Sequence, residues 1–219
     1  AMLAMDAEAA GDLKRAAELW TTVREAVPPP NVVEMISDEE ANRPKLLFWL
    51  AEKRAHDASQ TVPATLARLK EQIDKDRYLE STRPLSPTDP EALAIRALRY
   101  EQFGDRNRSK KTWDALQAMA AQEPDLLTWR LLAASQIVGL GDSGKDDDAA
   151  AERVAKLLKE SERFGVLAAK AAADPNPAIP RRDVRIACRE VIALYDDDPT
   201  PAIQTVVAKA KKLLEATPK

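Results

Sequence analysis

Residues 9–20 read AAGDLKRAAELW, and residues 102–113 read QFGDRNRSKKTW, which aligns with the first stretch without a gap. In both, a small residue stands five positions after the glycine and a tryptophan stands nine positions after it. Glycine can adopt the left-handed backbone conformation that ends a helix, and aspartate can cap the next helix. The small residue lets two helices approach closely, and the tryptophan lies one turn further along the same face. The two stretches therefore predict two helical hairpins with the same turn.

The spacing of apolar residues and prolines predicts helix along the rest of the chain. Glycine is scarce, at 6 of 219 residues, and the stretches rich in Ala, Leu, Lys, Arg and Glu favour helix over strand. Apolar residues recur at steps of three and four, as in Leu93, Ala97 and Tyr100, and no stretch alternates as a strand does. Prolines mark the breaks between helices. The predicted helices pair as 2–10 with 12–26, 43–58 with 63–80, 90–103 with 106–122, 125–138 with 147–173, and 181–195 with 200–216.

This pattern resembles the tetratricopeptide repeat (TPR), a family of stacked helix-turn-helix units. The turn glycine, the small and aromatic residues after it, and the proline after the second helix all match the family pattern. The match is good over about 90–140 and over the half-repeat at 4–28. Further matching positions are Ala97, Tyr100, Trp129, Leu132 and Ala133.

The resemblance implies an all-α fold of stacked antiparallel helical hairpins. We expect a TPR-like α-solenoid of about five hairpins, some of them degenerate. The chain would then be a single helical repeat domain over 1–219, in which 81–90 is either a hinge or an ordinary inter-repeat loop. The hairpins at 43–80 and 181–216 lack the Gly-turn-aromatic pattern, so they are either degenerate repeats or a different kind of helical hairpin.

For function, the resemblance implies a protein–protein interaction scaffold or adaptor. The first helix of each hairpin would face a concave groove that binds an extended peptide or a helix. Carried over residue by residue, the partner-binding positions are Glu91, Leu98, Glu101, Leu127, Arg130 and Ile137. Two alternatives stay open. One is a self-assembling structural module, and the other is a regulatory helical domain of a larger multidomain protein.

The residues that could support catalysis or bind metal are few. His56 is the single histidine and Cys188 the single cysteine, which argues against a zinc site and a catalytic triad. The motif Gly139-x-Gly141-x-x-Gly144 follows a predicted helix rather than a strand, which argues against nucleotide binding. Cys188 lies in an apolar run and is expected to be a buried thiol. We therefore expect no enzyme activity, no catalytic residue, no metal and no cofactor.

Charge and hydropathy narrow the class of partner. The net charge of −3 gives no reason to expect nucleic acid, and no apolar run is long enough for insertion into a membrane. The expected partner is a protein or peptide, with the chain itself a monomer or weakly self-associating. A lone cysteine is compatible with the cytoplasm and with the periplasm. The opening Ala1-Met2 is typical of a cloning remnant, so we expect a fragment of a longer protein.

Overall fold

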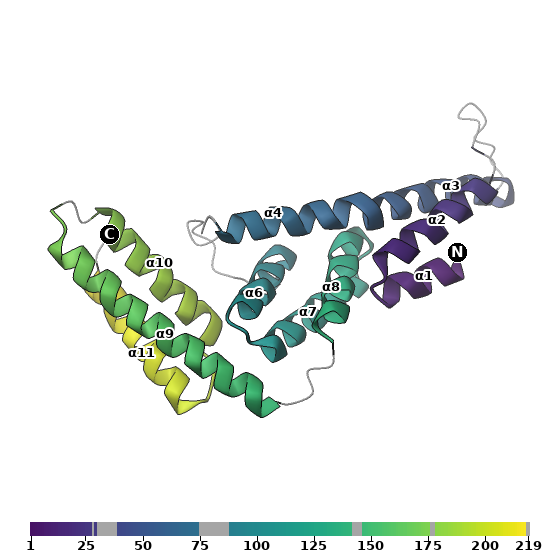
Figure 1. Ribbon diagram of the computed structural model, residues 1–219. Helices are drawn as coiled ribbons and strands as arrows, with labels where there is room; N and C mark the ends of the chain where they lie inside the picture. Colours follow the sequence, from purple (N-terminus) through teal and green to yellow (C-terminus); the bar gives the residue numbers. More distant parts are fainter. Residues whose placement is uncertain (28, 30–38, 75–87, 142–145, 176–177, 218–219) are drawn as a thin grey trace. The chain divides into compact units, whose positions relative to one another are not determined.

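The computed structural model describes residues 1–27, 29, 39–74, 88–141, 146–175 and 178–217 (Figure 1). Within these ranges every regular element is helical and none is a strand, which confirms the predicted all-α class. The elements are α1 (Met2–Ala9), α2 (Leu13–Ala26), α3 (Glu39–His56), η1 (Asp57–Thr61), α4 (Val62–Asp74), α6 (Pro90–Gln102), α7 (Arg106–Ala121), η2 (Pro124–Leu126), α8 (Leu127–Leu140), α9 (Asp146–Ala173), α10 (Ala178–Tyr195) and α11 (Pro201–Ala216).

The chain divides into two compact units. Unit 1 contains Ala1–Leu69 and Trp113–Gly141, and unit 2 contains Lys70–Thr112 and Asp142–Lys219. All four tryptophans belong to unit 1, whereas the single cysteine belongs to unit 2. The single domain over 1–219 stays a prediction, and most of the segment 81–90 lies outside the described residues.

The Gly-Asp turns have the same local structure in both units. Gly11 and Gly104 adopt the left-handed conformation, with φ of 72° and 73°. Asp12 Oδ1 accepts a hydrogen bond of 3.0 Å from the backbone N–H of Arg15, and Asp105 Oδ1 accepts one of 3.1 Å from that of Arg108. The small residues Ala16 and Ser109 and the aromatic residues Trp20 and Trp113 are all buried. The prediction of two matching turns is therefore confirmed at the level of hydrogen bonds and burial.

Unit 1 is built around the second helix of its first hairpin. α2 packs against both α1 and α3, as Figure 1 shows at the purple end of the chain. Trp20 on α2 is only 1% exposed and contacts small residues of both neighbours, Ala4 on α1 and Ala51 and Ala55 on α3. Alanines surround the indole because helices that approach closely leave no room for larger side chains. This packing fixes α1, which carries part of the site described below.

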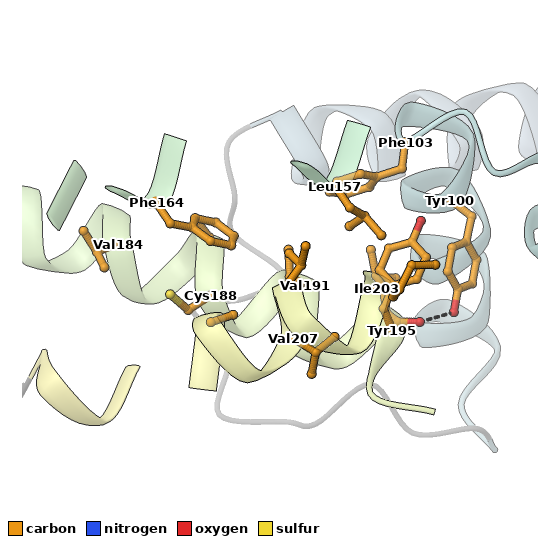
Figure 2. Packing of buried hydrophobic residues seen from close by; sticks show 14 of the residues in the cluster. Tyr100, Phe103, Leu157, Phe164, Val184, Cys188, Val191, Tyr195, Ile203 and Val207 are labelled. Atoms are coloured by element: carbon orange, nitrogen blue, oxygen red, sulfur yellow. Dashed lines mark hydrogen bonds between the residues drawn. The ribbon is translucent and has the colours of Figure 1, made fainter. Parts of the chain in front are cut away.

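The core of unit 2 lies between α9, α10 and α11, which contact one another pairwise. Figure 2 shows Phe164 and Leu157 of α9 directed toward Cys188 and Val191 of α10. Tyr195, at the end of α10, is fully buried. The predicted pairing of 181–195 with 200–216 is confirmed, because α10 and α11 have nearly these bounds and pack together.

The predicted hairpin at 43–80 is wrong. α3, η1 and α4 follow one another without a turn, and η1 is a π-helical segment after which the backbone N–H of Val62 donates to Asp57 O. The sequence predicts a break because proline lacks an N–H and clashes with the carbonyl four residues earlier. The π segment moves the hydrogen bonding from four to five residues back just before Pro63, so the helix passes through that proline.

Candidate binding groove

A groove in unit 1 lies between α1, α7 and α8 and has a volume of about 460 Å³. Most of its lining is apolar and comes from small side chains of all three helices. These side chains are Ala9, Ala118, Ala121 and Ala134, together with Met5. Its polar lining residues are Glu8, Asp114, Gln117 and Arg130. An apolar surface with a few polar groups is the usual composition of a binding site.

Glu8 connects α1 to α2, α3 and α8, and of these helices α1 and α8 line the groove. Its Oε1 accepts a hydrogen bond of 2.7 Å from Trp20 Nε1 on α2, and its Oε2 accepts one of 2.5 Å from Arg54 Nη1 on α3. Arg130 Nη2 on α8 lies 3.8 Å from the same Oε2. The Glu8 side chain is 3% exposed, and a buried carboxylate needs such donors to offset the loss of hydration.

The charges around Glu8 do not balance. Arg54 and Arg130 share one carboxylate, and only Arg54 lies within hydrogen-bond distance of it. The Arg130 side chain is 33% exposed and lines the groove, and a guanidinium carries five N–H donors. Arg130 therefore has free hydrogen-bonding capacity beside an apolar surface, and Asp114 adds a negative charge to the same lining.

The sequence builds the groove by keeping side chains small where helices meet. A Cβ at Gly11 would lie 2.5 Å from the carbonyl oxygen of Ala134, so only glycine allows the α1–α2 turn to approach α8 this closely. The same glycine has the positive φ that the turn requires. Ala118 and Ala121 stand three residues apart and share one face of α7. Larger side chains at these positions would fill the groove.

The six predicted partner-binding residues divide between the units: Glu91, Leu98 and Glu101 lie on α6 in unit 2, and Leu127, Arg130 and Ile137 lie on α8 in unit 1. Of the six, Arg130 is the one that lines the groove. Leu98 is buried, with 4% exposure, and Glu101 accepts a hydrogen bond of 3.0 Å from Ser109 Oγ. A binding role for these residues stays a prediction.

Sequence reasoning missed Glu8, although a signal for it was present. Glu8 stands three residues before Gly11, and Glu101 stands three residues before Gly104. In both units this glutamate accepts a hydrogen bond from the helix after the turn, from Trp20 or from Ser109. The alignment of the two stretches, extended by a few residues toward the N-terminus, would have identified Glu8 as part of the repeated unit.

Unit 2 has a polar cluster of a different kind, in which each arginine is matched by more than one carboxylate. Arg108 and Arg153 lie between the carboxylates of Asp105 and Asp198, with nitrogen–oxygen distances from 2.9 to 3.8 Å. Burial raises the pKa of Asp105, although the backbone N–H of Arg108 and the charge of Arg153 act against this rise. Burial would also raise the pKa of Asp198, but hydrogen bonds from Thr200 and the two arginines bring it below its usual value. Arg108 Nη1 also lies 3.2 Å from Oδ1 of the exposed Asp197, so two cations face three carboxylates, and this cluster joins helices.

No group of three or more His, Cys, Asp or Glu residues that could hold a metal ion occurs in the described part of the chain. None of the helices there is long and apolar enough to cross a membrane. No protein-family model, curated protein or solved structure matches this chain.

Proposed function

We propose that this chain is a protein-binding scaffold of the TPR-like kind, in which the groove of unit 1 holds a peptide or helix of a partner. The observation that carries the proposal is the pairing of an apolar groove with an arginine whose charge is only partly matched. An apolar side chain of the partner would cover the alanines, and a carboxylate of the partner would accept hydrogen bonds from Arg130.

The repeated turn supports the TPR-like part of the proposal. The two Gly-Asp stretches share backbone conformation, cap and burial, as repeats of one unit do. Families built from such units bind partners along a surface made by successive helices, which would extend the interface from Arg130 to Leu127 and Ile137 on α8. The proposal makes the chain a scaffold or adaptor and not an enzyme.

The test is a selection of random displayed peptides on the wild-type protein, followed by affinity measurements on two variants. Ala118→Phe places a large ring in the groove, whereas Ala115→Phe places the same ring on the same helix at an exposed position that does not line it. We expect Ala118→Phe to weaken binding of the selected peptides about tenfold or more, and Ala115→Phe to leave it unchanged. Circular dichroism checks that both variants keep the helical content of the wild type.

Arg130→Glu tests the charged part of the proposal. It should weaken the binding of selected peptides that carry Asp or Glu beside an apolar residue. Lys14→Glu reverses an exposed charge on α2 and should leave the binding of these peptides unchanged. Equal binding by wild type, Ala118→Phe and Arg130→Glu would contradict the groove as the binding site.

Self-assembly is a second candidate function, favoured by the exposed apolar side chains of α1. Met2 is 80% exposed and Leu3 is 65% exposed, on a helix with few charges. Exposed apolar surface of this kind is buried when a second helix covers it. Sedimentation equilibrium decides: a mass that rises with concentration in the wild type, but not in Leu3→Glu, supports self-assembly, and a constant monomer mass contradicts it.

A further inference from the structure

A basic hollow in unit 2 lies between α6 and α9 and has a volume of about 280 Å³. Four of its lining side chains are cationic, Arg99 from α6 and Lys156, Lys159 and Arg163 from α9. One acidic side chain, Glu160, also lines it. We call this site the α6–α9 hollow. It lies wholly within unit 2 and shares no residue with the groove of unit 1.

The cations of the α6–α9 hollow exceed the carboxylates that accompany them. Arg99 pairs with Glu190, and Arg163 Nη1 lies 3.0 Å from Glu160 Oε2. Lys156 Nζ lies 3.8 Å from Glu152 Oε1, beyond hydrogen-bond distance.

Lys159 is the fourth cation, and it is exposed. Within the described residues the structure shows no ion pair for it. The surplus therefore lies on α9, at Lys159 and at the weakly matched Lys156.

Phe103 is the apolar residue in the lining of the α6–α9 hollow. Phe103 lines the hollow and is 7% exposed, with the Arg99 guanidinium 5.8 Å from the centre of its ring.

We propose that the α6–α9 hollow binds an acidic peptide segment of a partner protein. A glutamate or aspartate side chain of that segment enters the hollow. Its carboxylate accepts hydrogen bonds from Lys159 and from Arg163, whose guanidinium has N–H donors beyond the nitrogen that faces Glu160. This site goes beyond the proposed groove, since it would give the scaffold a second contact with different chemistry. Two weak contacts on one chain raise the overall affinity when a partner engages both.

The observations favour an acidic peptide over a nucleic acid. Binding of a nucleic acid strand draws on a row of cations and on exposed aromatic rings that stack on bases. Here Phe103 is almost fully buried, Glu160 places a negative charge in the lining, and the net charge of the chain is −3. A hollow of about 280 Å³ with one acidic lining residue matches a single carboxylate better than a continuous phosphate backbone.

The test measures the fluorescence anisotropy of a labelled octaglutamate peptide as the protein is added. Labelled octalysine and an oligothymidine of eight nucleotides serve as comparison probes. The double variant Lys159→Glu/Arg163→Glu reverses two charges of the hollow. The matched control Lys170→Glu/Lys212→Glu reverses two exposed charges of α9 and α11 outside it, so the two variants have the same net charge.

We expect octaglutamate to bind the wild type and the control with similar affinity, more weakly as salt is raised because the contacts are screened. The hollow variant should lose about tenfold or more of that affinity. Lys159→Arg should keep it, since that variant retains the charge. The proposal is overturned if octaglutamate does not bind, if both double variants weaken it equally, or if oligothymidine binds more tightly than octaglutamate.

Discussion

Glu8 lies on α1 with almost none of its side chain exposed, and a tryptophan and two arginines from three other helices converge on its two oxygens. A carboxylate buried in this way is stable only while its donors remain, because the charge has lost its hydration. Arg54 in turn depends on Glu8, because its side chain is only 16% exposed and the Glu8 carboxylate offsets the hydration that its charge has lost. One residue therefore connects α1 to α2, α3 and α8.

Glu8→Ala should destabilise the protein by about 3 kcal/mol, because it leaves Arg54 and Trp20 without their acceptor. Glu8→Gln should cost less, since an amide oxygen can still accept from Trp20. Urea unfolding followed by tryptophan fluorescence measures both. Glu18→Ala, which removes an exposed glutamate from α2, is the control and should change little. An equally small effect at Glu8 would show that its carboxylate does not hold these helices.

Asp198 stabilises unit 2 at neutral pH, and this contribution is lost in acid. Its folded-state pKa lies below its usual value, because hydrogen bonds from Thr200 and the charges of Arg108 and Arg153 outweigh its burial. The stability it contributes is thus complete above the unfolded pKa of about 4 and is lost as the pH falls through the lower folded pKa. Asp198→Asn should lower stability at neutral pH by about 2 kcal/mol and reduce the further loss below about pH 4.

The measurement for Asp198→Asn is urea unfolding at several pH values followed by circular dichroism, which does not depend on the thiolate that Cys188 lacks in acid. The neighbouring Asp197 provides the control, because its side chain is 85% exposed. Asp197→Asn should leave the acid dependence close to that of the wild type. An unchanged acid dependence in Asp198→Asn would contradict the role of Asp198.

At the scale of elements, the two Gly-Asp turns should respond differently to the same substitution. Both glycines have positive φ, so alanine costs about 1 kcal/mol or more at either position. A Cβ at Gly11 would also meet the backbone of Ala134, which cannot move aside. A Cβ at Gly104 would meet only the ends of the Glu152 and Lys156 side chains, at 2.9 Å, and these can move.

Gly11→Ala should therefore destabilise unit 1 clearly more than Gly104→Ala destabilises unit 2. Urea unfolding measures the loss of stability in each variant. Tryptophan fluorescence reports on Gly11→Ala, and the reactivity of Cys188 reports on Gly104→Ala. Gly11 holds the α1–α2 turn against α8. Gly11→Ala should therefore also lower the affinity of the protein for the peptides selected on the groove. Equal losses at the two glycines would mean that the contact with Ala134 adds nothing to the cost of strain.

Most helix ends could be predicted from the sequence because they depend on neighbouring residues. Gly11 and Gly104 end helices, Asp12 and Asp105 cap the next ones, and the predicted bounds agree with the structure to within a few residues there. The failure at Pro63 has a local cause too, but the π segment that accommodates this proline has no comparable sequence signature.

The site could be predicted only in part, because its contacts join distant residues. Arg130 was identified through the repeat pattern, and it lines the groove. The hydrogen-bonded ion pair between Glu8 and Arg54 joins residues 46 positions apart, and no periodicity in the sequence relates the two. The hollow between α6 and α9 likewise depends on how two helices pack, which a one-dimensional pattern does not contain.

At the scale of the whole molecule, each unit has its own buried cluster and its own natural reporter. Trp20 is in the core of unit 1, and Cys188 is fully buried in the core of unit 2. Burial raises the pKa of the Cys188 thiol to about 11, so it is protonated and inaccessible in the folded state. Thiol reagents should react with it only after unit 2 opens.

We expect the two reporters to give different midpoints in urea, since separate cores unfold as separate cooperative units. Glu8→Ala should move the tryptophan midpoint more than the midpoint of Cys188 reactivity. Coincident midpoints in the wild type, with equal shifts in the variant, would instead show a single cooperative transition.

The π segment η1 also has a consequence for how the chain tolerates insertions and deletions. A π turn holds one residue more than an α turn, and one residue rotates an α-helix by about 100°. Ala51 and Ala55 before η1 and Val62 and Leu69 after it are all buried. The number of residues in η1 thus sets the angular phase between the two helices, which is the rotation about the helix axis that relates the buried side chains before η1 to those after it. A one-residue deletion within α4 would turn the later side chains out of the core. Within 57–61 a one-residue deletion would instead relax the helix to regular α geometry and keep that phase, because it removes the extra residue that the π turn holds.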